Sequence, residues 1–162
     1  MVSAPFVSTF VALAIIPVAF LFVHAFVSGI RGRRYHYITG MVAVIWDLSL
    51  SISYMVYRAI GGAVEGSSLQ LVNSAAIYFE VHGIVAVVVI FLEIGVLCTG
   101  VLRMREIRSA ASKENANGVQ GDLRLQYHGY ARFHSWFAKP LFVLWWFAFL
   151  SGEIFYIVLY ML

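Results

Sequence analysis

Four stretches of the chain are almost entirely apolar, and short or polar segments separate them. A helix needs roughly 20 predominantly apolar residues to cross the hydrocarbon core of a bilayer. All four stretches reach that length, because they cover residues 5–30, 37–60, 75–102 and 135–162. The pattern therefore predicts an all-α integral membrane protein, a four-helix bundle that forms one domain over residues 1–162.

The composition excludes a water-soluble domain of this size. Hydrophobic residues make up 62% of the 162 residues, and charged residues only 12%. One small core could not bury so many large apolar side chains, so membrane lipid must surround most of the surface. The single cysteine, Cys98, cannot form an intrachain disulfide. No phosphate-binding loop, CxxC motif or catalytic serine pattern is present, so the sequence predicts no catalytic residues and favours a protein that is not an enzyme.

The basic residues are concentrated in two of the three connections. The first connection contains Arg31, Arg33 and Arg34, and the third, over residues 103–134, is long, polar and basic. The middle connection, residues 61–74, contains no Lys or Arg. Because basic loops remain in the cytoplasm, we expect both basic loops inside and both termini outside, in the plasma membrane of a prokaryote. The net charge of +3 reflects this loop bias and does not indicate a nucleic-acid partner.

Ionisable residues recur at intervals of eleven within the apolar stretches. His36, Asp47 and Arg58 are eleven residues apart, and His82 and Glu93 repeat this spacing in the third stretch. Eleven residues are about three helical turns, so each set shares one helix face. Ionisable residues in membrane spans nearly always face the bundle interior, a cavity or each other. We therefore predict a buried polar network made of Asp47, Tyr54, Arg58, Glu80, Glu93 and Glu153.

The histidines are candidate ligands. His36 and His134 begin the second and fourth predicted helices on the same side of the membrane, and His24 lies near that edge. Two imidazoles from different helices at one depth could hold a haem b iron or a copper ion. The predicted cofactor-binding residues are His36, His134 and His24, and the predicted metal ligands are His36, His134 and His82. Helix rise separates His82 from the other level by about 20 Å or more, so it belongs to another site.

Structural explanations remain open for the same residues. His24 could be an interfacial residue that hydrogen-bonds to a carbonyl, and His128 could be solvated in the polar loop. Asp47 and Glu93 could be a neutral pair that shares a proton and only fixes packing, because two adjacent carboxylates do not readily both ionise. Arg58 could extend its side chain to the outer headgroups.

The histidine positions resemble those of a small four-helix membrane family of haem-copper oxidase assembly factors, the YozB or CtaM-like proteins. In that family the second helix opens with a His and has a Tyr eighteen residues later, as His36 and Tyr54 do here. The family also has a second His at the outer end of this helix, where this chain has Arg58. The resemblance covers roughly residues 30–162.

Two further helices match the same family. Its third helix begins with a His followed by small apolar residues, as His82 does in "VHGIVAVVV". Its fourth helix is introduced by a His with a Gly eighteen residues later, which corresponds to His134 and Gly152. The resemblance implies an accessory or assembly protein that handles haem or copper for a membrane partner such as a respiratory oxidase.

The residues themselves are compatible with two other functions. One is a b-type cytochrome subunit of a respiratory chain, which would pass electrons between quinol and a partner. The other is a non-redox structural subunit of a larger membrane complex, in which the buried polar groups set the register of the helices.

Overall fold

The computed structural model describes residues 4–33, 35–61, 73–117 and 128–161. Within these residues the chain forms helices and no strands. The helices are α1 (Phe6–Ile30), α2 (His36–Ala59), α3 (Asn73–Asn117) and α5 (His128–Tyr160). Each contains a segment that is long and apolar enough to cross a membrane. The predicted all-α bundle of four membrane-spanning helices is therefore confirmed.

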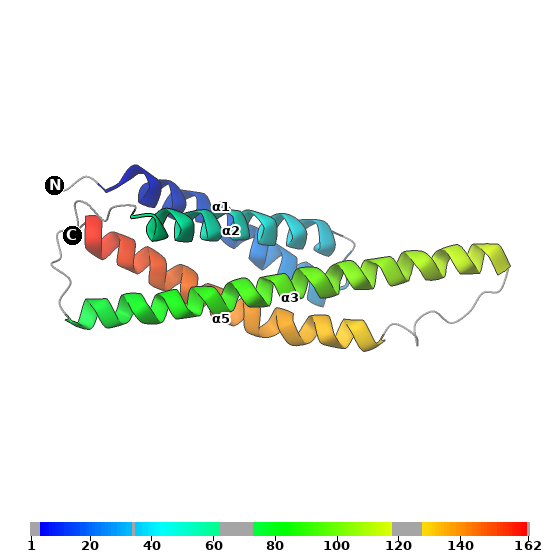
Figure 1. The fold of residues 1–162 in the computed structure, drawn as a ribbon. Helices are drawn as coiled ribbons and strands as arrows, with labels where there is room; N and C mark the ends of the chain where they lie inside the picture. Colours follow the sequence, from blue (N-terminus) through cyan, green and yellow to red (C-terminus); the bar gives the residue numbers. More distant parts are fainter. Residues whose placement is uncertain (1–3, 34, 62–72, 118–127, 162) are drawn as a thin grey trace.

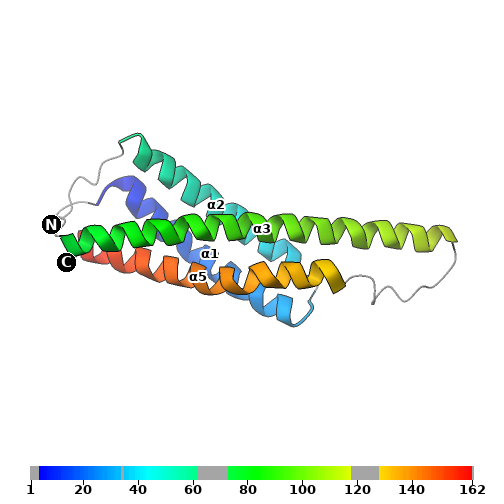
Figure 2. The same ribbon diagram turned by 60° about the horizontal axis from the view of Figure 1, so that its bottom comes forward.

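The helices pack as two pairs of neighbours along the chain. α1 packs mainly against α2, and α3 packs mainly against α5, with smaller contacts between α1 and α5 and between α2 and α3 (Figures 1 and 2). Both chain termini lie at the same end of the bundle (Figure 1). We call this the terminal end. The opposite end, which carries Arg31, Arg33, Arg103 and Arg105, is called the basic end.

Two helices are longer than the apolar pattern predicts. We predicted a loop over residues 103–134, but α3 continues to Asn117 and α5 already begins at His128. The extension of α3 reads "RMREIRSAASKENAN" and is rich in Arg, Glu and Ala, which favour helix even where the chain has left the lipid. This part of α3 projects beyond the other helices (Figure 1). The limit of apolar sequence thus marks the edge of the membrane span, not the end of the helix.

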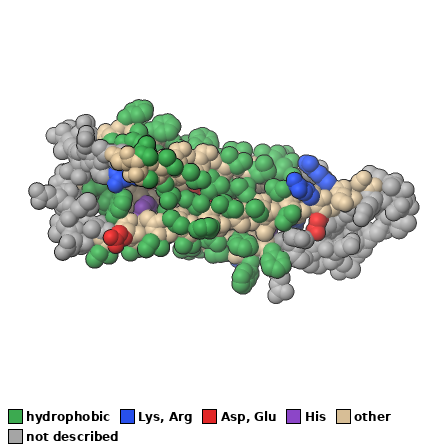
Figure 3. Space-filling model, in the orientation of Figure 1, with side chains coloured by type: hydrophobic (Ala, Val, Ile, Leu, Met, Phe, Trp, Pro, Cys, Tyr) green, Lys and Arg blue, Asp and Glu red, His purple; other side chains and the backbone are tan. Residues whose placement is uncertain are grey.

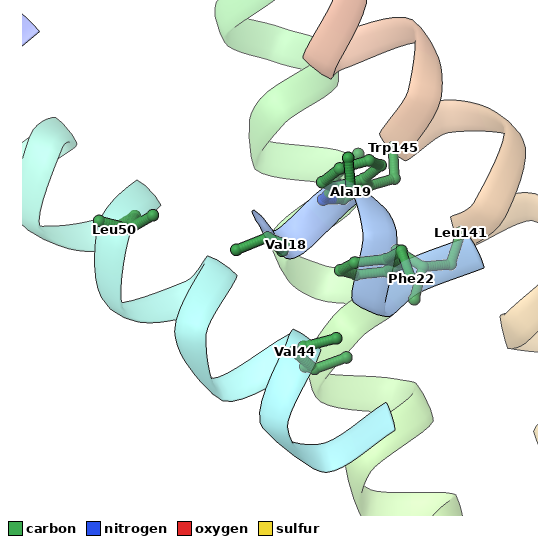
Figure 4. Close-up of a cluster of buried hydrophobic side chains, with 9 residues drawn as sticks. Val18, Ala19, Phe22, Val44, Leu50, Leu141 and Trp145 are labelled. Atoms are coloured by element: carbon green, nitrogen blue, oxygen red, sulfur yellow. The ribbon is translucent and has the colours of Figure 1, made fainter. Parts of the chain in front are cut away.

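The buried core is small and lies where the four helices meet. Figure 4 shows Val18, Phe22, Val44, Leu141 and Trp145 in this cluster. The Phe22 and Trp145 rings stack with their centroids 4.4 Å apart. Most other large apolar side chains are exposed, and they cover the middle of the face in Figure 3, while charged side chains lie toward its ends. Such a surface is stable when lipid surrounds it.

Candidate functional site

Two histidines from different helices meet at the basic end. His36 is the first residue of α2, and His134 lies in the second turn of α5. Their ring centroids are 5.9 Å apart, and the ring planes are inclined at 76°. Both side chains are half-buried. The structure thus brings together the two residues that the sequence identifies as the main candidate ligands.

The hydrogen bond of His36 determines which ring nitrogen carries the proton. Its Nδ1 lies 2.7 Å from the carbonyl oxygen of Ala25 on α1. A carbonyl oxygen can only accept, so His36 donates from a protonated Nδ1. In the neutral imidazole the other nitrogen, Nε2, then carries a free lone pair. His36 in this state therefore has one nitrogen available as a metal ligand.

His134 is held in the same tautomer by a side chain of α3. Its Nδ1 lies 3.2 Å from the Thr99 Oγ1. Thr99 donates its own hydroxyl proton to the carbonyl oxygen of Gly95, at 2.7 Å. With that proton on Gly95, the Thr99 oxygen can accept from a protonated Nδ1 of His134, and in this tautomer the free lone pair of the neutral ring is on Nε2. Ligating histidines usually donate their second nitrogen to a carbonyl, a carboxylate or a water in this way.

Glycines next to the two rings provide the space that they occupy. A Cβ atom at Gly29 would lie 2.7 Å from the Nδ1 and Cε1 of His36, which is closer than such atoms can approach. A Cβ atom at Gly100 would lie 3.6 Å from the Cε1 of His134, an ordinary contact. Gly29 is therefore required for the observed position of His36, whereas Gly100 is compatible with a small side chain.

A cavity of about 300 Å³ adjoins both rings. Besides the two histidines, its lining includes Gly40, Val44, Gly100 and Arg103. The buried Nε of Arg103 has no hydrogen-bond partner in the part of the chain that the structure describes. The volume lies at the small end of the range for ligand pockets, roughly 300–1,000 Å³. The cavity therefore suits a metal ion with a small anionic ligand better than it suits a haem, which is a large ligand.

The other predicted ligands lie elsewhere. His24 is exposed on α1 and lines a different groove. The side chain of His128 is outside the described residues. Among the described residues, no group of three or more His, Cys, Asp or Glu side chains is placed to hold a metal ion. The His36–His134 pair therefore offers two protein ligands and leaves other coordination positions open.

His82 forms a separate polar site toward the terminal end. Its Nδ1 lies 2.8 Å from the Ser151 Oγ, and Ser151 donates to the carbonyl oxygen of Ala148 at 3.0 Å. The Tyr78 hydroxyl donates to the carbonyl oxygen of Ser151 at 2.9 Å. The Ser151 oxygen can therefore accept from a protonated Nδ1 of His82, and in this tautomer the free lone pair is on Nε2. The structure thus places this imidazole beside the hydroxyl group of Ser151, at a site separate from that of His36 and His134.

The members of the predicted polar network divide into two groups. Asp47 and Glu93 are 3% and 0% exposed, and their carboxyl groups are neighbours in the bundle interior. The indole of Trp145 also lies against Asp47. Neither carboxyl oxygen of Glu93 has a hydrogen-bond partner among the described residues. The pair lies one turn beyond Val44 of the cavity lining, toward the terminal end.

The remaining members lie nearer the terminal end. The Arg58 guanidinium lies 5.5 Å from the centre of the Phe79 ring, and it is close to Tyr160, as is Tyr54. Glu80 is exposed and Glu153 is half-buried. The spacing of eleven thus places Asp47 and Glu93 correctly on interior faces, but it does not predict which outer residues touch.

The sequence analysis did not identify four residues that contact the histidines or line their cavity: Thr99, Ser151, Arg103 and Gly29. Thr99 and Ser151 each form a hydrogen bond with a histidine of the neighbouring helix. A serine or threonine in an apolar helix does not by itself predict such a bond. A usable signal exists in the spacing. Each hydroxyl residue lies seventeen residues after a histidine of its own helix and directly before a glycine.

Comparisons with protein-family models, with curated proteins and with solved structures found no match for this chain. The resemblance to oxidase assembly factors therefore stays a hypothesis.

Proposed function

We propose that the chain is a membrane accessory protein that binds a copper ion through His36 and His134 and supplies it to a partner complex. The observation that carries the proposal is the shared state of the two imidazoles. The Nδ1 of each ring lies within hydrogen-bond distance of a protein oxygen, and both rings line one cavity. In the Nδ1-protonated tautomer each ring offers the lone pair of Nε2 as a ligand. Imidazole nitrogen is a preferred ligand of copper.

The incomplete ligand set favours transfer over permanent storage. Structural metal sites are usually closed by four protein ligands, whereas sites with open positions exchange ligands with water or other molecules. Two imidazoles would hold the ion, and Arg103 would provide a positive charge for an anion that accompanies it. An ion held in this way could pass to stronger ligands on a partner protein.

The identity of the partner rests on the resemblance noted in the sequence. That resemblance favours a haem-copper oxidase, whose assembly requires both cofactors in the membrane. Haem b is the alternative cofactor, and it would make the chain a b-type cytochrome. The small volume of the cavity favours copper. A structural subunit without a cofactor would use the same hydrogen bonds only to set helix register.

Copper titration of the purified protein in detergent tests the proposal. The wild-type chain should bind one Cu equivalent, and His36→Ala and His134→Ala should each abolish tight binding. Thr99→Ala removes only the group that orients His134, so affinity should fall by roughly 10–100-fold. His24→Ala is the matched control, because this histidine is exposed and outside the cavity.

Three outcomes would contradict the proposal. Unchanged copper binding in the His36→Ala/His134→Ala double variant would assign the metal to other residues. A reducible haem spectrum in the purified wild-type chain would favour the cytochrome. If the wild-type chain bound neither ligand while its thermal unfolding in detergent remained cooperative, the structural-subunit function would be supported instead.

A further inference from the structure

A second and larger hollow, about 560 Å³ in volume, follows α1 toward the basic end. Apolar side chains of α1 and two aromatic rings of α5 form most of its wall. These residues are Ile16, Phe20, Val23, Val27, Trp146 and Phe149. Because α1 and α5 share only a small contact, the space between them is open to the lipid. We call this hollow the α1 groove.

The length of the α1 groove matches one leaflet of a bilayer. Its deepest residue on α1, Ile16, lies near the middle of the span Phe6–Ile30. From there to the end of the helix the rise is about 21 Å. Half of a hydrocarbon core of about 30 Å, together with one headgroup layer, gives about 20–22 Å. A groove of this length fits an acyl chain.

The charges at the α1 groove are positive and lie at its headgroup end. Arg31 and Arg33 line it directly after α1, and both are exposed. His24 lies two turns deeper, about 10 Å from Arg31 along the helix, near the depth of glycerol esters. None of the described residues that line the groove is acidic. The groove is therefore complementary to an apolar chain that ends in a phosphate.

We infer that the α1 groove binds one anionic phospholipid from the leaflet on the basic side. One acyl chain lies along Ile16–Val27 against Trp146 and Phe149, and the phosphate lies at Arg31 and Arg33. His24 hydrogen-bonds near the ester groups, which explains an exposed imidazole that takes no part in the His36–His134 site. This inference does not depend on copper binding.

Native mass spectrometry of the full chain in detergent can test the inference. The protein is incubated with equal amounts of phosphatidylglycerol and phosphatidylcholine of the same acyl composition. The wild-type chain should retain one phosphatidylglycerol in preference to phosphatidylcholine. Arg31→Gln should lower this retention about fivefold, as expected for the loss of one cation at a lipid surface.

Two further variants distinguish the groove from a general charge effect. Arg108→Gln removes the same charge from an exposed position of α3 outside the groove, and it should leave retention unchanged. Val23→Trp should fill the groove and lower retention of the lipid while both arginines remain. Arg33 is not chosen, because it also lines the cavity of the two histidines.

Several results would overturn the inference. One is equal retention of the two lipids by the wild-type chain, which would indicate bulk annular lipid. A second is an equal loss in Arg31→Gln and Arg108→Gln, which would indicate attraction to overall charge. A third is full displacement of the lipid by inorganic phosphate, which would reduce the site to an anion site formed by the arginines alone.

Discussion

The Nδ1 of the His82 imidazole on α3 is hydrogen-bonded to the Ser151 hydroxyl of α5, 2.8 Å away. The reverse contact exists toward the basic end, where the Nδ1 of His134 on α5 is hydrogen-bonded to the Thr99 hydroxyl of α3. In both cases the hydroxyl group also donates to a backbone carbonyl one turn earlier in its helix. The two helices therefore hold each other by reciprocal bonds, one near each membrane edge.

The reciprocity has a simple basis in the sequence. α3 and α5 are antiparallel neighbours, and each contains a histidine followed seventeen residues later by a hydroxyl residue and then by a glycine. The segments are His82 to Gly100 and His134 to Gly152. Seventeen residues span about 25 Å, close to the thickness of the hydrocarbon core. The same spacing in both helices brings each histidine opposite the hydroxyl group and the glycine of the other.

Replacement of Gly152 by alanine should destabilise the α3–α5 pair. The added Cβ would lie 3.2 Å from the Cε1 of His82, and this ring is held by Ser151. Overpacking typically costs about 1–3 kcal/mol, partly offset by the helix propensity of alanine, about 1 kcal/mol. We expect a lower melting temperature in detergent. The matched control is Gly83→Ala, since nothing lies within 4 Å of its added Cβ, and it should be neutral or stabilising. Equal effects would show that His82 is not tightly held.

Replacement of Gly29 by alanine should disturb the His36–His134 site without removing a ligand. The new Cβ would overlap the His36 ring, so the imidazole must leave its bond to Ala25. Copper affinity should then fall nearly as far as in His36→Ala. Gly40→Ala is the control, because Gly40 lines the same cavity but its Cβ would lie 3.9 Å from its nearest neighbour, an ordinary contact. Equal affinities for the two variants would mean that the hydrogen bond to Ala25 does not orient the ligand.

The orientation of the bundle can be measured with single cysteines. In a Cys98→Ser background, a cysteine at either terminus should react with a membrane-impermeant maleimide from outside intact cells. A cysteine introduced at Ser109, at the basic end of the α3 span, should react only after the cells are opened. We expect this labelling pattern because basic loops of membrane proteins remain in the cytoplasm. A C-terminus labelled only in opened cells would show that the membrane orientation is opposite or that the number of crossings is odd.

The sequence predicts the elements well because lipid imposes one strong rule. A span must be apolar and helical over roughly 20 residues, so α1 and α2 are found to within one residue of their observed ends. The same rule does not predict the full length of α3 and α5, because both helices continue beyond their apolar segments. In those polar extensions, the helix propensity of the residues is the relevant signal.

The contacts of the site were only partly predictable. Equal depth brings His36 and His134 to one level, and the spacing of eleven turns Asp47 and Glu93 inward. Depth and helix face do not specify which helices are neighbours. For this reason His24, at a similar depth, could not be separated from the pair by sequence. The role of Ser151 likewise depends on α5 packing against α3, which no local pattern encodes.

The buried Asp47–Glu93 pair gives a final prediction about stability. Two adjacent buried carboxyl groups do not readily both ionise, so at least one of them keeps its proton and can donate a hydrogen bond. Asp47→Asn should therefore be tolerated, because an amide can replace that donor and keeps the shape. Asp47→Leu leaves Glu93 buried without a polar neighbour on α2 and should cost about 1–3 kcal/mol.

A double-mutant cycle of thermal unfolding in detergent makes this prediction quantitative. Replacement of a buried polar pair by two apolar residues is often nearly neutral, so Asp47→Leu/Glu93→Leu should be more stable than Asp47→Leu alone. Ser49→Leu serves as the control, since Ser49 is exposed on the same helix and should tolerate leucine. Strictly additive losses in the double variant would mean that the two carboxyl groups contribute independently. In that case, their mutual interaction could not account for their position in the core, and each would have to be stabilised by other neighbours, such as the Trp145 indole beside Asp47.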